Sequence, residues 1–131
     1  MAVFCVEEKV AKVLKKSAVT ESVSEKAFLS QAIASPVSRN MTAGYLKLEA
    51  GYAKEIVSPV DEVDLVLSGA VTCLCDGDDI VARKGDILFI EKGTRAHFSA
   101  SCDCLLFMVT YPLLQETVDA MMKKRTRNDN E

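Results

Sequence analysis

Hydrophobic and polar residues along the chain change their period near residue 41. In residues 2–16 the apolar side chains recur at helical spacing, at Val3, Val6, Val10, Val13 and Leu14. This spacing predicts an amphipathic helix or arm within residues 1–20 that packs on the domain or on a partner. The pattern is weak from 17 to 40, where the apolar stretch 27–34 before Ser35-Pro36 predicts one edge strand, since proline is tolerated at strand ends.

After Asn40 the period becomes two, and short apolar or alternating runs follow one another at intervals of about ten residues. Turn residues separate them, among them Asp76-Gly77, a strong hairpin signal because glycine accepts positive φ at no steric cost. The runs predict strands at 41–49, 62–67, 71–75, 80–83, 87–90, 96–100 and 105–111. Many short strands with no intervening helix indicate an all-β sandwich or closed barrel.

The C-terminal part returns to helical spacing after Pro112, which ends the last strand. Acidic residues come early in this segment and basic residues late, the order that complements a helix dipole. We therefore expect a terminal helix over 113–125. At 131 residues and 14.3 kDa the chain has the size of one domain, which we place at 21–131 with this helix included.

Charge and hydropathy narrow the classes of partner. A net charge of -3 and a pI near 5.2 provide no basic field for phosphates, so we expect no nucleic acid partner. No apolar run reaches the roughly 18 residues of a membrane span, and Glu7, Glu8 and Lys9 interrupt any signal-peptide core. We expect a cytoplasmic protein without a membrane partner.

Five cysteines, an odd number, favour free thiols in a reducing compartment. Four of them form two C-x-C pairs, Cys73 with Cys75 and Cys102 with Cys104, which suggests zinc. In a strand, however, i and i+2 side chains stand roughly 6.6 Å apart, whereas two thiolates on one zinc must approach to about 3.8 Å. We therefore interpret the cysteines as small hydrophobic residues.

Three segments resemble a known family. They are residues 61–69 (DEVDLVLSG), residues 85–93 (GDILFIEKG) and residues 109–112 (VTYP). The glycines of the first two resemble the two motifs of the RmlC-like cupin superfamily, and all three segments are similar to the cupin domain of ethanolamine utilisation protein EutQ. The resemblance covers roughly residues 41–112. It implies a cupin jelly-roll β-barrel, or double-stranded β-helix, here with short N- and C-terminal helices.

The metal ligands of the superfamily are mostly missing from this sequence. Metal-binding cupins use two histidines and a glutamate from the first motif and a histidine from the second. Glu62 stands at the glutamate position, but residues 55–58 read EIVS, and Ala96 stands where the last histidine belongs. His97, the sole histidine, is one place later, which in a strand turns it to the opposite face unless a bulge intervenes. We therefore expect no bound metal.

Glu62 and Asp64 are the main candidates for a site. If the strand pattern holds, both point to one face, and buried acids are rarely retained unless paired or used. The alternatives are a salt bridge from Glu62 to Lys47, Lys92 or Arg95 and, for His97, a partly buried imidazole with a hydrogen-bond partner. The candidate ligand-binding residues are Glu62, Asp64, His97, Tyr45, Tyr111 and Arg95.

Three functions remain open at this point, and the residues do not decide whether the chain is an enzyme. The first is a metal-free, homodimeric ligand-binding or accessory protein for a small polar molecule; the resemblance adds an ethanolamine or small-amine pathway and an association with bacterial microcompartments. The second is a metalloenzyme that holds a divalent ion through Glu55, Glu62 and His97. The third is a metal-free isomerase with His97 as base and Tyr111 or Asp64 as partner. The acetate kinase activity linked to a longer relative would need a Mg-nucleotide site, for which Asp61, Glu62 and Asp64 are the only acidic cluster.

Overall fold

The structure, a computed structural model, describes residues 20–24, 26–33, 40–112 and 114. Apart from residues 20 and 114, the helices predicted within 1–20 and over 113–125 lie outside the described residues. The described part forms ten strands: β1 Thr20–Ser24, β2 Ala27–Ile33, β3 Thr42–Leu48, β4 Tyr52–Val57, β5 Asp61–Ser68, β6 Ala70–Cys75, β7 Asp78–Arg83, β8 Ile87–Ile90, β9 Arg95–Ala100 and β10 Cys104–Tyr111.

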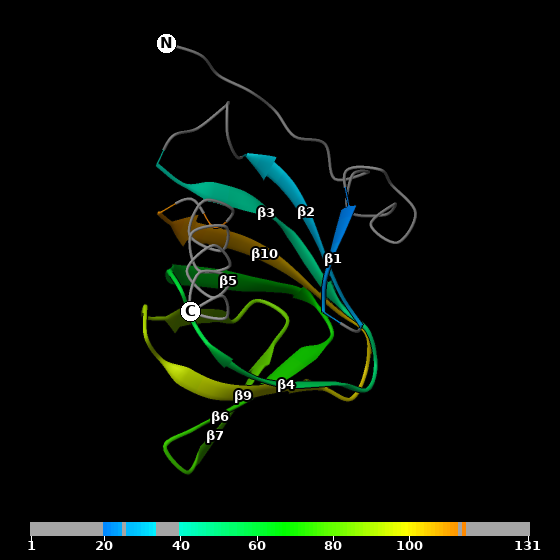
Figure 1. Cartoon of the computed structure of the whole chain (residues 1–131). Helices are drawn as coiled ribbons and strands as arrows, with labels where there is room; N and C mark the ends of the chain where they lie inside the picture. Colours follow the sequence, from blue (N-terminus) through cyan, green and yellow to red (C-terminus); the bar gives the residue numbers. More distant parts are fainter. Residues whose placement is uncertain (1–19, 25, 34–39, 113, 115–131) are drawn as a thin grey trace, which may run out of the picture.

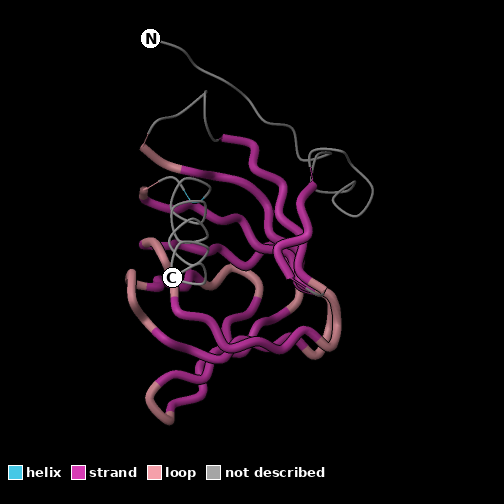
Figure 2. The backbone as a smooth tube through the Cα atoms, in the orientation of Figure 1, coloured by secondary structure: helices cyan, strands magenta, loops and turns pink. Residues whose placement is uncertain are grey.

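The strands form two antiparallel sheets (Figure 1). The six-stranded sheet has the order β1-β2-β3-β10-β5-β8, and the four-stranded sheet has the order β4-β9-β6-β7. Strands that are neighbours in a sheet are often distant in sequence, as β3, β10 and β5 are, because the chain crosses repeatedly between the sheets through the loops at their ends (Figure 2). The all-β jelly-roll predicted from the sequence is confirmed.

The predicted strands after residue 41 all exist, but the sequence reading missed two others. β4 was not predicted, and neither was β1. β2 forms where the early apolar stretch predicted a strand, yet the prediction of an edge strand is wrong. β1 pairs with one side of β2 and β3 with the other, so β1 takes the edge.

The hairpin predicted at Asp76-Gly77 joins β6 and β7, which pair from Cys75 with Asp78 to Ala70 with Arg83. Asp76 has φ 51° and Gly77 has φ 81°. A two-residue turn with positive φ at both positions matches the right-handed twist of the strands that it connects. The local sequence therefore set the register of this hairpin.

The inward side chains of both sheets form the hydrophobic core. The buried core cluster consists of Ala27, Leu48, Tyr52, Val66, Val71, Ala82, Ala100, Cys104 and Leu106. On β5 this cluster includes Val66, and the positions two and four residues earlier on the same face are Asp64 and Glu62. Two carboxyl groups therefore follow directly on the apolar core along the inner face of β5.

Candidate functional site

β5 carries Glu62 and Asp64 on the inner face of the six-stranded sheet. The strand alternates, with Asp64 and Val66 buried and Val63 between the two acids exposed. Asp64 lies opposite Met108 of β10 on one side and Leu88 of β8 on the other. Because residues two apart in a strand share a face, the pairing brings both carboxyl groups to the same side, as the sequence predicted for this strand.

Among the described residues, Asp64 is the one Asp, Glu, Lys, Arg or His that is buried, with 3% of its surface exposed. Burial is the main reason that its pKa rises, to about 10, and a hydrogen bond to Glu62 together with the negative charge of Glu62 adds to the rise. Asp64 is therefore protonated at neutral pH. Its Oδ1 atom is buried without a hydrogen-bond partner within the part of the chain that the structure describes.

Two threonines, which the sequence reading missed, continue the site across the sheet. Thr110 pairs with Glu62 on one side and with Thr42 on the other, so the three share the inner face. Both threonines are buried. The Thr110 hydroxyl donates to the carbonyl oxygen of Pro112 at 3.2 Å, and the Leu114 N–H donates to Thr42 Oγ1 at 3.1 Å. The sequence does contain a signal for Thr110: it stands two residues after Met108 and four after Leu106, so the two-residue period of this strand places it on the inner face.

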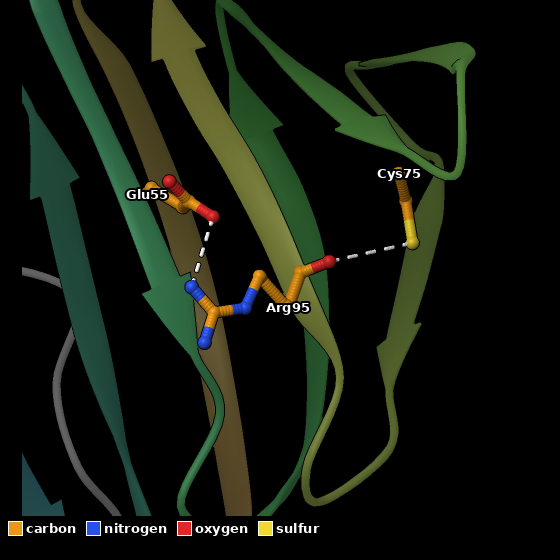
Figure 3. Close-up of polar contacts among 3 residues, drawn as sticks. All are labelled: Glu55, Cys75 and Arg95. Carbon is orange, nitrogen blue, oxygen red and sulfur yellow. Dashed lines mark hydrogen bonds and ion pairs between the residues drawn. The ribbon is translucent and has the colours of Figure 1, made fainter.

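His97 and Arg95 lie on the outer face of the four-stranded sheet. His97 is exposed, opposite Glu55 of β4 and Leu74 of β6. The Arg95 guanidinium donates to the Glu55 carboxylate at 3.2 Å, and the Arg95 carbonyl accepts from the Cys75 thiol at 3.7 Å (Figure 3). Arg95 is thus paired with Glu55, and the structure does not bring His97 or Arg95 to Glu62.

The alternative ligand set of Glu55, Glu62 and His97 is divided between two faces. Glu55 and His97 are cross-strand neighbours outside the four-stranded sheet, whereas Glu62 is inside the six-stranded sheet. Among the described residues, no three His, Cys, Asp or Glu side chains come close enough together to hold a metal ion. These three side chains therefore do not form one coordination sphere in this fold.

Tyr45 and Tyr111 occupy outward positions of the six-stranded sheet. Tyr45 packs edge-on against Phe107 with ring centroids 6.2 Å apart. Tyr111 follows Thr110 on β10 and is 61% exposed. Neither ring lies on the face that carries Glu62 and Asp64. Of the six predicted pocket residues, the fold brings together only the two carboxylic acids.

The cysteines of the two C-x-C pairs differ in environment. Cys73 and Cys104 are buried, Cys75 is partly buried and Cys102 is exposed. Burial is the main cause that raises the pKa of the Cys73 thiol and raises that of Cys104 to about 11. Thiols that keep their protons are poor metal ligands, since the thiolate is the form that binds.

Comparison with known proteins gives a consistent result. Residues 5–116 match the family described as ethanolamine utilisation protein EutQ. The acetate kinase EutQ of Escherichia coli K12 is 29% identical over 73 residues, which is 56% of this chain and 31% of that protein. The chain thus spans about a third of the length of the curated relatives that it matches.

Solved structures share the fold. The structure of the Clostridium difficile EutQ protein superposes with a TM-score of 0.62 at 24% identity, over 66% of this chain and 68% of that one. An RmlC-like cupin from Shewanella frigidimarina gives 0.63 at 14% identity, over 74% and 86%. In the described part of this chain, no helix has the length and apolar character needed to cross a membrane.

Proposed function

Because this chain belongs to the family of ethanolamine utilisation protein EutQ, we propose that it is a ligand-binding accessory cupin, which holds a small polar molecule at Glu62 and Asp64. One observation carries the proposal: Asp64 is buried beside Glu62 with its Oδ1 atom unpaired among the described residues. A buried polar atom without a partner costs free energy, about 1–3 kcal/mol, that a bound ligand would recover. Its membership in a family of ethanolamine utilisation proteins supports the further proposal that it acts in the cytoplasm, in association with a bacterial microcompartment.

The site is proposed to work without a resident metal, on the basis of its donor atoms. The inward positions of β9 are Ala96, Phe98 and Ala100, and the sole imidazole of the chain, that of His97, faces outward. The polar groups beside Glu62 on the inner face are carboxyl and hydroxyl oxygens, and the carboxyl group of Asp64 is protonated at neutral pH. The buried thiols of Cys73 and Cys104 have raised pKa values and keep their protons at neutral pH. Transition metals of cupin enzymes favour imidazole nitrogen, so this set fits them poorly.

Binding is also favoured over the phosphoryl transfer named in the relatives. A Mg-nucleotide site would need acidic side chains that converge. Asp61 Oδ1 instead accepts from the Lys92 N–H at 2.8 Å, and Asp61 alternates with Glu62 along β5. The three acids of the cluster are therefore split between the two faces of the strand.

We propose further that the protein is a homodimer that pairs through the outer face of β5, β8 and β10. Large apolar side chains are exposed there, with Ile87 67% and Phe89 63% exposed. Phe89 lies opposite Val63, and Val63 lies opposite Val109, so the apolar surface is continuous across three strands. A contiguous exposed apolar patch marks an interaction surface.

Light scattering after gel filtration tests this interface. The wild type should be a dimer and Phe89→Asp a monomer, while the matched control Ile80→Asp on β7 should remain a dimer. A dimeric Phe89→Asp variant would contradict this interface.

A binding experiment tests the ligand site. The full chain, labelled with ¹⁵N, is titrated separately with ethanolamine, acetate and glycerol, and amide shifts are followed by NMR. At least one should shift the amides of β5 and β10, and Glu62→Gln should remove those shifts while Glu55→Gln keeps them. Metal analysis of the purified protein accompanies the titration. One transition metal per chain that is lost in Glu62→Gln would overturn the proposal in favour of a metalloenzyme.

A further inference from the structure

We propose that the molecule held at Glu62 and Asp64 is a small ammonium cation, and that it binds in exchange for the proton that the two carboxyl groups share. This inference rests on the proposed function of the site and adds its ligand class and its dependence on pH. Three observations carry it: the chemistry of the inward atoms, the burial of Asp64, and the charges that face it.

The first observation is that two oxygen atoms of the site present lone pairs that call for a hydrogen-bond donor. Asp64 Oδ1 is buried without a partner among the described residues. The Thr110 hydroxyl uses its proton on the Pro112 carbonyl, so it presents lone pairs to its surroundings. A molecule that satisfies both atoms must supply at least two hydrogen-bond donors, and an ammonium group carries three N–H donors and no acceptor.

The second observation is the burial of Asp64 among apolar neighbours, which restricts the charge that can enter. The neighbours of Asp64 across the sheet are Leu88 and Met108, which are apolar, and the pair lies next to the core residue Val66. An added charge in such surroundings is expensive unless it is compensated. When one ammonium ion enters and one proton leaves to solvent, the net charge of the interior stays the same. The exchange breaks one O–H bond on the carboxyl pair and forms no covalent bond to the ligand.

The third observation is the set of titratable groups that face Asp64. Its own strand contributes Glu62, and the β10 strand contributes Cys104; the inward positions of β3 and β8 carry none. In the opposite sheet, β9 has none at its inward positions, β4 has the buried Tyr52 and the exposed Lys54, and β6 has Cys73 and Cys75. On β7 the inward positions include Asp78, which is exposed. Burial raises the pKa of Cys104 to about 11 and raises that of Cys73. The pKa of Cys104, the thiol whose titration is coupled to the charge of Asp64, thus lies above that of Asp64, so of these two groups Asp64 yields its proton first.

The direction of the pH effect follows from linkage. In the free protein the pKa of Asp64 is about 10, and a bound cation stabilises its carboxylate and lowers that pKa. Between the two values, binding releases up to one proton per ligand, and the affinity rises by up to about tenfold per pH unit. An amine remains cationic up to about pH 9, so the range from pH 6 to 8.5 reports on the protein.

The test is isothermal titration calorimetry of the full chain with methylammonium chloride at pH 6, 7 and 8. Each pH is measured in two buffers of different ionisation enthalpy, because their difference gives the number of protons released. We expect proton release near one and a Kd that falls several-fold per pH unit. Asp64→Asn should abolish the proton release and the pH dependence, and Glu62→Gln should weaken binding at least tenfold. Glu55→Gln, on the outer face, should behave like the wild type.

The outcomes separate this inference from the proposed function. If methylammonium binds without proton release, the proton exchange is wrong but the binding site stands. The same conclusion follows if proton release persists in the Asp64→Asn variant and the circular dichroism spectrum of that variant is native. No binding of methylammonium, together with binding of glycerol or acetate that is lost in Glu62→Gln, overturns the ligand class alone. If none of the three binds, the inference and the proposed function fall together. Tetramethylammonium, a cation without N–H donors, should bind at least tenfold more weakly, and equal affinity would contradict the role of the acceptors.

Discussion

Ala96 and His97 are neighbours on β9 that face opposite sides of the four-stranded sheet. Ala96 is 3% exposed and belongs to the inner face, while His97 is exposed on the outer face. The register of β4 and β9 is regular across both residues, with Ile56 opposite Ala96 and Glu55 opposite His97. Without a bulge to restore it, the displaced histidine cannot reach the interior.

The first prediction concerns this histidine. His97→Ala should change the free energy of unfolding by less than about 0.5 kcal/mol, because an exposed side chain away from special features contributes little. Urea denaturation measures this change, and the ¹⁵N titration checks ligand binding, which should remain. An isomerase with His97 as its base would instead lose its turnover and its ligand shifts in this variant.

The second prediction is that stability falls as pH rises. Asp64 has an ordinary pKa of 3.8 and a pKa of about 10 in the folded chain, so between these values the folded state binds more protons than the unfolded state. The stabilisation is complete below the unfolded pKa and is lost as pH rises through the folded pKa, at up to about 1.4 kcal/mol per pH unit. Urea denaturation at pH 6, 7, 8 and 9 should show this decline, and Asp64→Asn should flatten it. A decline of equal slope in that variant would assign it to other groups.

The third prediction compares two glycines with positive φ. A Cβ atom on Gly69 would overlap the carbonyl oxygen of Asp103 and lie 3.0 Å from Cα of Cys104, whereas one on Gly77 meets nothing within 4 Å. Asp103 is held in place, since its Oδ1 atom accepts from the Ala50 N–H at 2.9 Å. Gly69→Ala should therefore cost about 3 kcal/mol or more, and Gly77→Ala about 1–2 kcal/mol for its backbone conformation alone. Chemical denaturation of both variants measures the difference. Equal losses in the free energy of unfolding would show that the backbone at Asp103 moves aside to accommodate the new methyl group.

The fourth prediction concerns thiol reactivity. Cys102 is exposed, whereas Cys104, two residues later, is buried with its pKa raised to about 11 by burial. Iodoacetamide at pH 8 should modify Cys102 readily and should reach Cys104 and Cys73 only after unfolding, because the thiolate is the reactive form. Peptide mass spectrometry of the native and urea-treated protein locates the label. Rapid native labelling of Cys104 would contradict the packing of β10.

Several strands could be predicted from the sequence because one face of each is buried and the other is exposed to solvent, which gives the residues a two-residue period. β5 and β10 show this alternation in their residues, and both were predicted within one or two positions. β4 was missed because it has little apolar contrast: from Ala53 to Glu55 it is exposed on both faces. Its pairing with β9, a strand about forty residues away in sequence, makes it a strand.

The candidate site likewise has a part that the sequence predicted and a part that depends on the tertiary structure. The shared face of Glu62 and Asp64 followed from their spacing in one strand. The positions of Tyr45, Tyr111 and Arg95 depend on which face of each strand is turned inward, and the sequence reading placed them in the interior with the acids. The structure turns all three outward.

The sequence by itself determined the strands with a two-residue period, the β6–β7 turn, the family resemblance and the shortage of imidazoles, because each of these is written in neighbouring residues. Only the tertiary structure decided that Glu55 and Arg95 pair outside the barrel, that Thr42 and Thr110 lie beside Glu62, and that Asp64 is buried deeply enough to keep its proton. These features arise where strands distant along the chain are brought into register, and their electrostatics depend on how much water that packing removes.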